Sequence, residues 1–182
     1  MVGNKYAQDY EIVTQQDTRG HSSTKLQYHG KYYEVFFENG NIRHFRITSI
    51  IVLLIALVLH IGAGFINNPG MRHIFLMIPY VAIFLPLYYL AAGILALPKS
   101  PSPYRRDQID LSFMRIRASR RYLTILLFAI TIAEVAFLLT SPGGIDARLE
   151  VPFLIMEAAA GVILAIYSFL QKRITIKIQD QE

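Results

Sequence analysis

The sequence predicts an all-α integral membrane protein, a bundle of four transmembrane helices with a small cytoplasmic β element. Three observations lead to this fold class. Hydrophobic residues make up 53% of the 182-residue chain and the mean hydropathy is +0.36, which is too apolar for an ordinary soluble domain. The apolar residues gather into segments of about twenty, the length of helix that crosses a bilayer. Lys and Arg are concentrated in alternate connecting segments, as in other proteins with several spans.

The N-terminal region has two parts. Residues 1–30 are polar and rich in Gln, Asp, Ser and Thr, so we expect a flexible cytoplasmic segment. Residues 31–46 are predicted to form a juxtamembrane β-hairpin. The aromatic run Tyr32–Phe37 precedes Asn39-Gly40, a dipeptide typical of two-residue hairpin turns, and Ile42–Arg46 would be the second strand.

Residues 47–171 form the predicted transmembrane domain. Turn-forming or charged residues separate four apolar segments, and each is long enough to cross the hydrocarbon core as a helix of about 30 Å. The second segment carries Pro79 and Pro86, which predict a bent helix because each proline lacks an N–H group. The predicted spans are residues 47–66, 73–97, 122–141 and 151–171.

A basic cytoplasmic loop, residues 98–121, connects the second and third spans. Ile109, Phe113 and Ile116 recur in it at helical spacing and predict a short amphipathic helix that lies along the membrane surface. Arginines flank this apolar stripe, and we expect them to contact anionic lipid at the cytoplasmic face. The alternative is a retention loop whose charge only fixes the orientation of the chain. The arginines are Arg105, Arg106, Arg115, Arg117, Arg120 and Arg121.

The C-terminal tail, residues 172–182, contains the alternating segment Ile174–Ile178. Strict alternation of apolar and polar residues is typical of a half-buried strand. We expect this strand to join the hairpin of residues 31–46, since a lone hairpin is only marginally stable in water.

The distribution of positive charge predicts the orientation of the chain. Sixteen of the 18 Lys and Arg residues lie before the first span, in residues 98–121 or after the fourth span, and only Arg72 and Arg148 lie in the two other loops. By the positive-inside rule both termini are cytoplasmic, and we expect the chain in the cell membrane. This placement explains the net charge of +5, so no nucleic-acid partner is expected.

Four polar residues fall at one depth in the predicted bundle. Glu134 and Glu157 lie in the third and fourth spans, His60 lies in the first and Tyr80 in the second. At 1.5 Å per residue, each lies roughly 10–12 Å below the outer end of its helix. Ionisable groups at this depth are costly unless they meet a partner or a water-filled cavity. The sequence therefore predicts a polar layer in the outer half of the bundle.

This polar layer is compatible with several functions. We expect a non-enzymatic membrane subunit or scaffold, in which the layer hydrogen-bonds across helices or meets a partner subunit. The alternative is a small oligomeric transporter or proton-binding protein that uses Glu134, Glu157 and His60. The same three residues could bind a divalent metal, although the chain lacks the Glu-x-x-His pairs typical of four-helix di-metal sites. An enzyme that uses the glutamates as general acid and base is a further alternative.

The expected partners follow from the same reasoning. They are the lipid bilayer, anionic lipid at its cytoplasmic face, and either a second copy of the chain or another membrane subunit. Cysteine is absent, which excludes disulfides, a thiolate metal site and a cysteine nucleophile.

Overall fold

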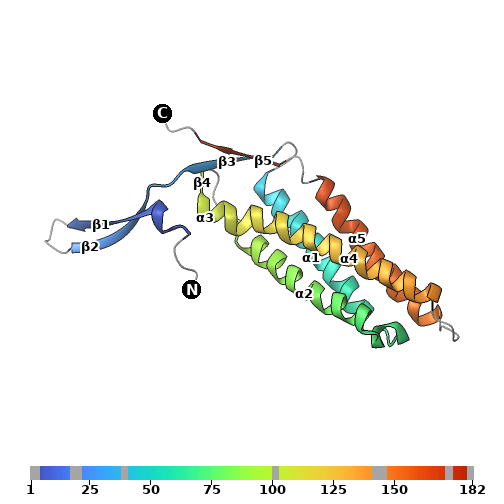
Figure 1. Ribbon diagram of the computed structural model, residues 1–182. Coiled ribbons are helices and arrows are strands. Elements are labelled where there is room, and N and C mark those ends of the chain that lie inside the picture. Colours follow the sequence, from blue (N-terminus) through green and yellow to red (C-terminus); the bar gives the residue numbers. More distant parts are fainter. Residues whose placement is uncertain are drawn as a thin grey trace.

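The computed structural model describes residues 5–16, 22–37, 41–99, 103–140, 147–170 and 174–179. Four long helices lie side by side as an elongated bundle, and the strands gather at one end of it (Figure 1). The predicted turn at Asn39-Gly40 lies outside the described residues.

The four long helices match the four predicted spans in number and order. Each is long and apolar enough to cross a membrane, by length and composition. Their ends differ from the prediction by several residues, most of all in the third helix, which begins well before residue 122. The second helix continues through Pro79 and Pro86. The helices are α1 (Ile42–Gly64), α2 (Ile74–Leu95), α4 (Arg115–Thr140) and α5 (Ala147–Leu170).

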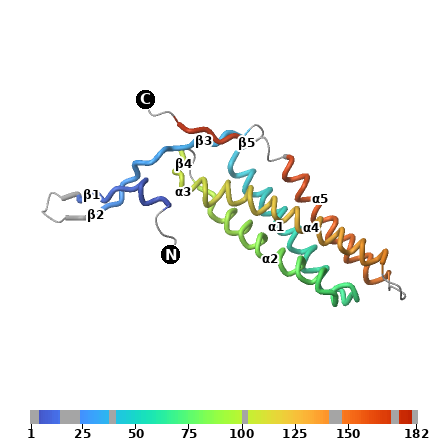
Figure 2. The backbone as a smooth tube through the Cα atoms, in the orientation of Figure 1, coloured from blue at the N-terminus to red at the C-terminus, as the bar shows by residue number. Residues whose placement is uncertain are grey.

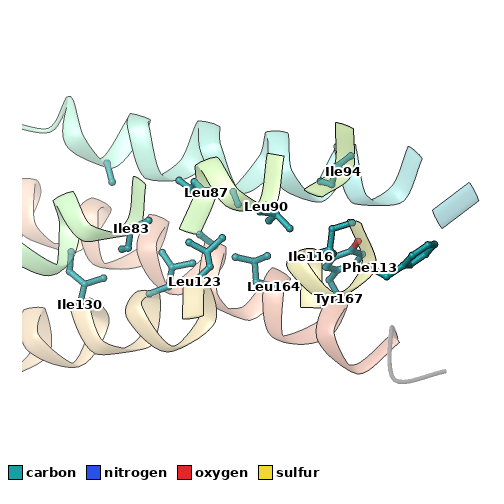
Figure 3. Close-up of a cluster of buried hydrophobic side chains, with 14 of the residues drawn as sticks. Ile83, Leu87, Leu90, Ile94, Phe113, Ile116, Leu123, Ile130, Leu164 and Tyr167 are labelled. Carbon is teal, nitrogen blue, oxygen red and sulfur yellow. The ribbon is translucent and has the colours of Figure 1, made fainter. Parts of the chain in front are cut away.

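The long helices form a closed ring around a core of branched aliphatic side chains. α2 packs against α4, α4 against α5 and α5 against α1, while α1 and α2 make a smaller contact. Gly93 lets α2 approach α4 closely, because a Cβ atom there would lie only 2.9 Å from Ile116 Cγ1. The core side chains between the helices include Ile83, Leu90, Leu123, Ile130 and Leu164 (Figure 3).

The outer surface of the bundle is apolar as well. In the apolar window of each helix, only 22–33% of the residues are buried. Large side chains such as Val58, Leu85 and Ile132 are 67%, 63% and 68% exposed. A soluble protein rarely exposes apolar surface over whole helices, whereas a bilayer solvates such a surface. This surface is compatible with four membrane-spanning helices.

The third helix belongs to a longer helical run. α3 (Arg106–Ile109) and the π-helical turn η3 (Asp110–Met114) continue directly into α4, so the run covers 35 residues from Arg106 to Thr140. At 1.5 Å per residue it is about 50 Å long, well beyond the ~30 Å hydrocarbon core of a bilayer. Its first turns extend to the end of the bundle where the strands lie (Figure 1).

The apolar stripe of this run faces the protein interior. Ile109, Phe113 and Ile116 are all buried. Phe113 stacks on Phe45 near the start of α1, with ring centroids 5.7 Å apart. The prediction of an amphipathic helix on the membrane surface is therefore wrong, because the stripe meets aromatic side chains of the protein instead of lipid.

A three-stranded antiparallel sheet lies at the same end of the bundle. β3 (Tyr32–Phe37) is its central strand, between β5 (Ile174–Ile178) and the two-residue β4 (Tyr104–Arg105). The register places Val35 opposite Ile176. The predicted C-terminal strand and its pairing with Tyr32–Phe37 are confirmed.

The second half of the predicted β-hairpin is wrong. Ile42–Arg46 opens helix α1 and does not form a strand. Asn41 precedes it in an extended conformation, and its side chain accepts a hydrogen bond from the backbone N–H of His44 at 3.0 Å. This N-cap satisfies a donor that the first turn of a helix leaves free, so the chain begins a helix here.

The N-terminal region forms a second sheet, where a flexible segment was expected over residues 1–30. β1 (Tyr10–Gln16) and β2 (Ser22–Tyr28) pair antiparallel after the short 3-10 turn η1 (Ala7–Asp9). This pair of strands extends away from the end of the bundle (Figure 2).

Several polar contacts connect the N-terminal region to the bundle, among them two ion pairs. Lys5 Nζ donates to Asp110 Oδ2 at 2.7 Å, and this hydrogen bond raises the pKa of Lys5. The guanidinium of Arg106 lies 3.8 Å from the carboxylate of Asp9. Both pairs are partly exposed to solvent, so they orient the region more than they stabilise it.

Candidate functional site

The bundle interior buries three acidic side chains completely. Glu134 lies on α4, and Glu150 and Glu157 lie on α5. His60 on α1 is equally buried, at 1% exposure. These residues form two groups, which we call the histidine pair (His60 and Glu157) and the acid pair (Glu134 and Glu150).

The histidine pair joins α1 to α5. His60 Nδ1 and Glu157 Oε1 are 2.8 Å apart, a hydrogen bond of normal length. Aromatic rings of α2 cover the imidazole: the centroids of Tyr80 and Phe84 lie 4.3 Å and 5.0 Å from that of His60. The Tyr80 hydroxyl donates to the backbone carbonyl of His60 at 3.1 Å. Three helices therefore meet at this pair.

Small residues lie on the inward face of α1 on both sides of His60. Ser49, Ala56 and Ala63 are buried on the same inward face as His60, as the helical spacing of the sequence predicts. One turn beyond His60, Gly64 lies against Tyr80. A Cβ atom on Gly64 would overlap the Tyr80 hydroxyl and lie 2.8 Å from its Cζ. Glycine at this position therefore permits Tyr80 to reach the His60 carbonyl.

The acid pair lies at the opposite end of the bundle from the three-stranded sheet, beside the connection between α1 and α2. This connection contains the 3-10 turn η2 (Pro69–Arg72). Glu150 Oε1 accepts the backbone N–H of Gly70 at 2.8 Å, and Oε2 accepts the Asn68 side-chain amide at 2.7 Å. Both hydrogen bonds are buried. Glu150 thus attaches the start of α5 to the turn that precedes α2.

Glu134 and Glu150 face each other across Gly70. A Cβ atom on Gly70 would lie 3.0 Å from Glu150 Oε2 and 3.2 Å from Glu134 Oε2, so glycine leaves the space that both carboxyl groups occupy. The two carboxyl groups therefore lie close together. Neighbouring carboxyl groups in a protein interior repel each other when both are ionised, so a proton on one of them is favoured.

The hydrogen bonds around the acid pair distinguish its two members. Glu150 accepts two N–H donors, which suits an ionised carboxylate. Neither oxygen of Glu134 has a hydrogen-bond donor in the described part of the chain. The pattern therefore assigns the negative charge to Glu150 and the neutral, protonated form to Glu134.

The structure brings together three of the four residues of the predicted polar layer. Tyr80 and Glu157 both contact His60, whereas Glu134 lies beside Glu150 instead. Among the residues that the structure describes, no group of three His, Asp or Glu is placed to hold a metal ion. The predicted metal ligands His60, Glu134 and Glu157 are thus divided between two pairs, and neither pair gains a third such ligand.

Sequence reasoning missed three residues of the acid pair and its surroundings: Glu150, Asn68 and Gly70. Glu150 lies seven residues before Glu157 and therefore on the same helix face, which was a usable signal. Asn68 and Gly70 belong to a turn-forming segment, and turn chemistry alone explains their presence in the sequence. Only the fold shows that this turn supplies two donors to a buried carboxylate.

A third polar group lies in the half of the bundle nearer the sheet. The hydroxyls of Ser49 and Tyr167 share a hydrogen bond between α1 and α5. The Arg120 guanidinium lies 5.7 Å from the Tyr167 ring centroid, and Arg120 is only 5% exposed. Its side chain is therefore inside the bundle and not at the lipid surface, where we expected it.

The other five arginines of this region lie nearer to the surface. Arg105 and Arg106 face the N-terminal region. Arg117 donates to the backbone of β5 at 3.4 Å. Arg115 and Arg121 line hollows on the outer surface of the four-helix bundle.

Each polar pair can hold a proton, and each joins segments that are far apart in the chain. Comparison with protein-family models, with curated proteins and with solved structures finds no match to this chain. The function is therefore argued from the geometry of the two pairs and from the surface of the bundle.

Proposed function

We propose that the protein is a four-helix integral membrane protein that acts as a non-enzymatic subunit or scaffold. Hydrogen bonds of its buried glutamates hold the helices in one arrangement. The apolar outer surface of the bundle supports the membrane location. Both termini and residues 98–121 would face the cytoplasm of the cell, because 16 of the 18 Lys and Arg residues lie on that side.

The hydrogen bond between His60 and Glu157 carries this proposal. It is completely buried and joins the first helix of the bundle to the last. Burying two ionisable groups in a bilayer costs several kcal/mol unless they satisfy each other, so their pairing restricts which faces of α1 and α5 can meet. This is the role expected of a contact that specifies one arrangement of helices.

The β1–β2 pair offers a surface for a partner subunit. Ile12 and Leu26 are opposite each other in the register, and they are 68% and 71% exposed. These strands project from the end of the bundle that we place in the cytoplasm (Figure 2). An exposed apolar pair on a two-stranded sheet suits addition of a partner's strand or helix.

A second candidate function, proton binding by a small oligomeric transporter, is favoured by the acid pair. Most buried polar groups in proteins have a hydrogen-bond partner, and a carboxyl group with a purely structural role would be expected to follow this rule. Glu134 lacks a donor among the described residues. A carboxyl group with one proton and no competing donor can release and recover that proton.

Proton flux into liposomes separates the two functions. The full-length protein is reconstituted with a pH-sensitive dye inside the vesicles, and a potassium gradient with valinomycin drives protons inward. The scaffold function predicts the flux of protein-free vesicles for the wild type. Flux above this level that Glu134→Gln abolishes, and that the exposed control Glu11→Gln retains, would overturn the scaffold function in favour of proton transport.

A further inference from the structure

We propose that a groove between α2 and α4 binds an acyl chain of an anionic phospholipid and places the lipid phosphate at Arg115. The site rests on the membrane location proposed above and adds a specific lipid to it. None of its residues belongs to the histidine pair or the acid pair.

The groove is a hollow of about 490 Å³ on the outer surface of the bundle. Its α2 wall comes from residues spaced as one face of a helix, and so does its α4 wall. Apolar and aromatic side chains line it along most of its length, and a single cation lies in its lining. The main lining residues are Ala82, Leu85 and Tyr89 on α2 and Arg115, Tyr122 and Leu126 on α4.

Helix packing explains where the groove begins and ends. α2 and α4 touch closely at Gly93, where a Cβ atom would lie 3.2 Å from the backbone nitrogen of Ile116. The helices run antiparallel, so the groove opens next to this contact, between Tyr89 and Arg115. From Arg115 to Leu126 it covers about 16 Å along α4, close to the thickness of one hydrocarbon leaflet.

The order of side chains along the groove matches the layers of a bilayer leaflet. Tyr122 and Tyr89 are 66% and 45% exposed, and exposed tyrosines on spanning helices are typical of the membrane–water interface. Arg115 lies about 10 Å from Tyr122 along α4, toward the basic end of the chain, which is the headgroup side. Leu126 lies on the opposite, hydrocarbon side.

Arg115 supplies the charge that a lipid phosphate would complement. Its guanidinium lies 6.0 Å from the Tyr89 ring centroid. No carboxylate in the described part of the chain lies within ion-pair distance of it. A cation at the headgroup end of an apolar groove is complementary to an anionic phospholipid, because the phosphate and the acyl chain are then satisfied together.

Tryptophan fluorescence tests this site directly, because the chain contains no Trp. Leu85→Trp places a reporter on the rim of the groove, and Leu54→Trp places one on the exposed face of α1 as the control. Each full-length variant is reconstituted in phosphatidylcholine vesicles that contain a fixed fraction of acyl-brominated phosphatidylglycerol or of acyl-brominated phosphatidylcholine. Bromine quenches a tryptophan that it contacts.

We expect brominated phosphatidylglycerol to bind near Leu85→Trp about fivefold more tightly than brominated phosphatidylcholine, and the two lipids to quench Leu54→Trp equally. Arg115→Gln should bring the ratio of the affinities for the two lipids close to one. Ala118→Phe, which fills the groove from an exposed position, should lower it as well. Arg43→Gln removes a cation outside the groove, in the first turn of α1, and should leave the ratio unchanged.

A ratio near one at Leu85→Trp, or a ratio that Arg115→Gln does not change, would overturn the lipid site. The same preference at Leu54→Trp would also overturn it, since the preference would then be a property of the whole surface. Failure of both lipids to quench either reporter would overturn the membrane location itself. The two proposals therefore fail in different ways.

Discussion

The histidine pair and the acid pair bury the same kind of side chain in the same bundle, but they satisfy it differently. Glu157 faces a base, so one proton between His60 Nδ1 and Glu157 Oε1 makes the contact, while His60 Nε2 and Glu157 Oε2 have no hydrogen-bond partner among the described residues. Glu150 faces another acid and obtains its donors from the α1–α2 connection. A contact between unlike groups needs only the proton that the two partners already hold, whereas a pair of like groups depends on an added proton and on nearby donors.

The prediction with the largest expected effect tests whether the histidine pair stabilises the packing of α1 against α5. Glu157→Leu leaves His60 buried without its partner, and we expect a loss of about 3–5 kcal/mol in the free energy of unfolding. Titration with a denaturing detergent, followed by circular dichroism, measures it. The double variant with His60→Leu should recover much of the loss, because an apolar pair replaces a broken polar one. A double variant less stable than Glu157→Leu would contradict this account.

The next effect tests whether Glu150 is the charged member of the acid pair. Glu150→Gln keeps the shape of the side chain but replaces one acceptor oxygen with an NH₂ group, so Asn68 or Gly70 loses its acceptor. We expect a loss of about 2 kcal/mol in the free energy of unfolding, the usual worth of a hydrogen bond to a charged group. Chemical unfolding of the two purified proteins measures it, and equal stability would place the charge elsewhere.

A glycine substitution tests the packing of Tyr80 on the histidine pair. Gly64→Ala would drive a methyl group into the Tyr80 hydroxyl, and we expect a loss of about 1–2 kcal/mol despite the better helix propensity of alanine. The matched control is Gly161→Ala, whose Cβ would lie an ordinary 3.5 Å from Leu127 Cβ. That change should raise the melting temperature. A rise for both variants would show that Tyr80 moves freely.

The smallest effect concerns the protonated member of the acid pair. Glu134→Gln replaces a neutral carboxyl group with a neutral amide of nearly the same shape, so we expect a change below about 1 kcal/mol in the free energy of unfolding. The informative measurement compares the free energies of unfolding of Glu134→Gln and Glu150→Gln. If Glu134→Gln were the more damaging of the two, the assignment of charge within the acid pair would be reversed.

The number of helices could be predicted from the sequence, but the grouping of the acids could not. From the sequence, the depth of each polar residue in the bundle is estimated by counting residues from the expected end of its helix. In the structure α4 ends at Thr140 and α5 begins at Ala147, which puts Glu134 about 9 Å, Glu150 about 5 Å and Glu157 about 15 Å from the ends of their helices. Glu134 is thus nearer in depth to Glu150 than to Glu157.

Local patterns misled the prediction at two other places. Asn39-Gly40 resembles a hairpin turn, but the side chain of Asn41 caps a helix one residue later, and the cap decides the structure of Ile42–Arg46. The apolar stripe that includes Phe113 is equally typical of a helix on the membrane surface and of a helix buried in the protein. Only the position of Phe45, distant in the sequence, shows that it is buried. Both structures depend on side-chain contacts that the spacing of apolar residues in the sequence does not reveal.

The contacts of α1 with α5 have a mechanical consequence. β3 precedes α1 and β5 follows α5, so the β3–β5 ladder ties these helices together at one end, and His60–Glu157 ties them again about 27 Å further along α1. These two contacts, with the Ser49–Tyr167 hydrogen bond between them, oppose sliding or rotation of one helix against the other. The first and last helices of the bundle are therefore held in one register along most of the length of α1.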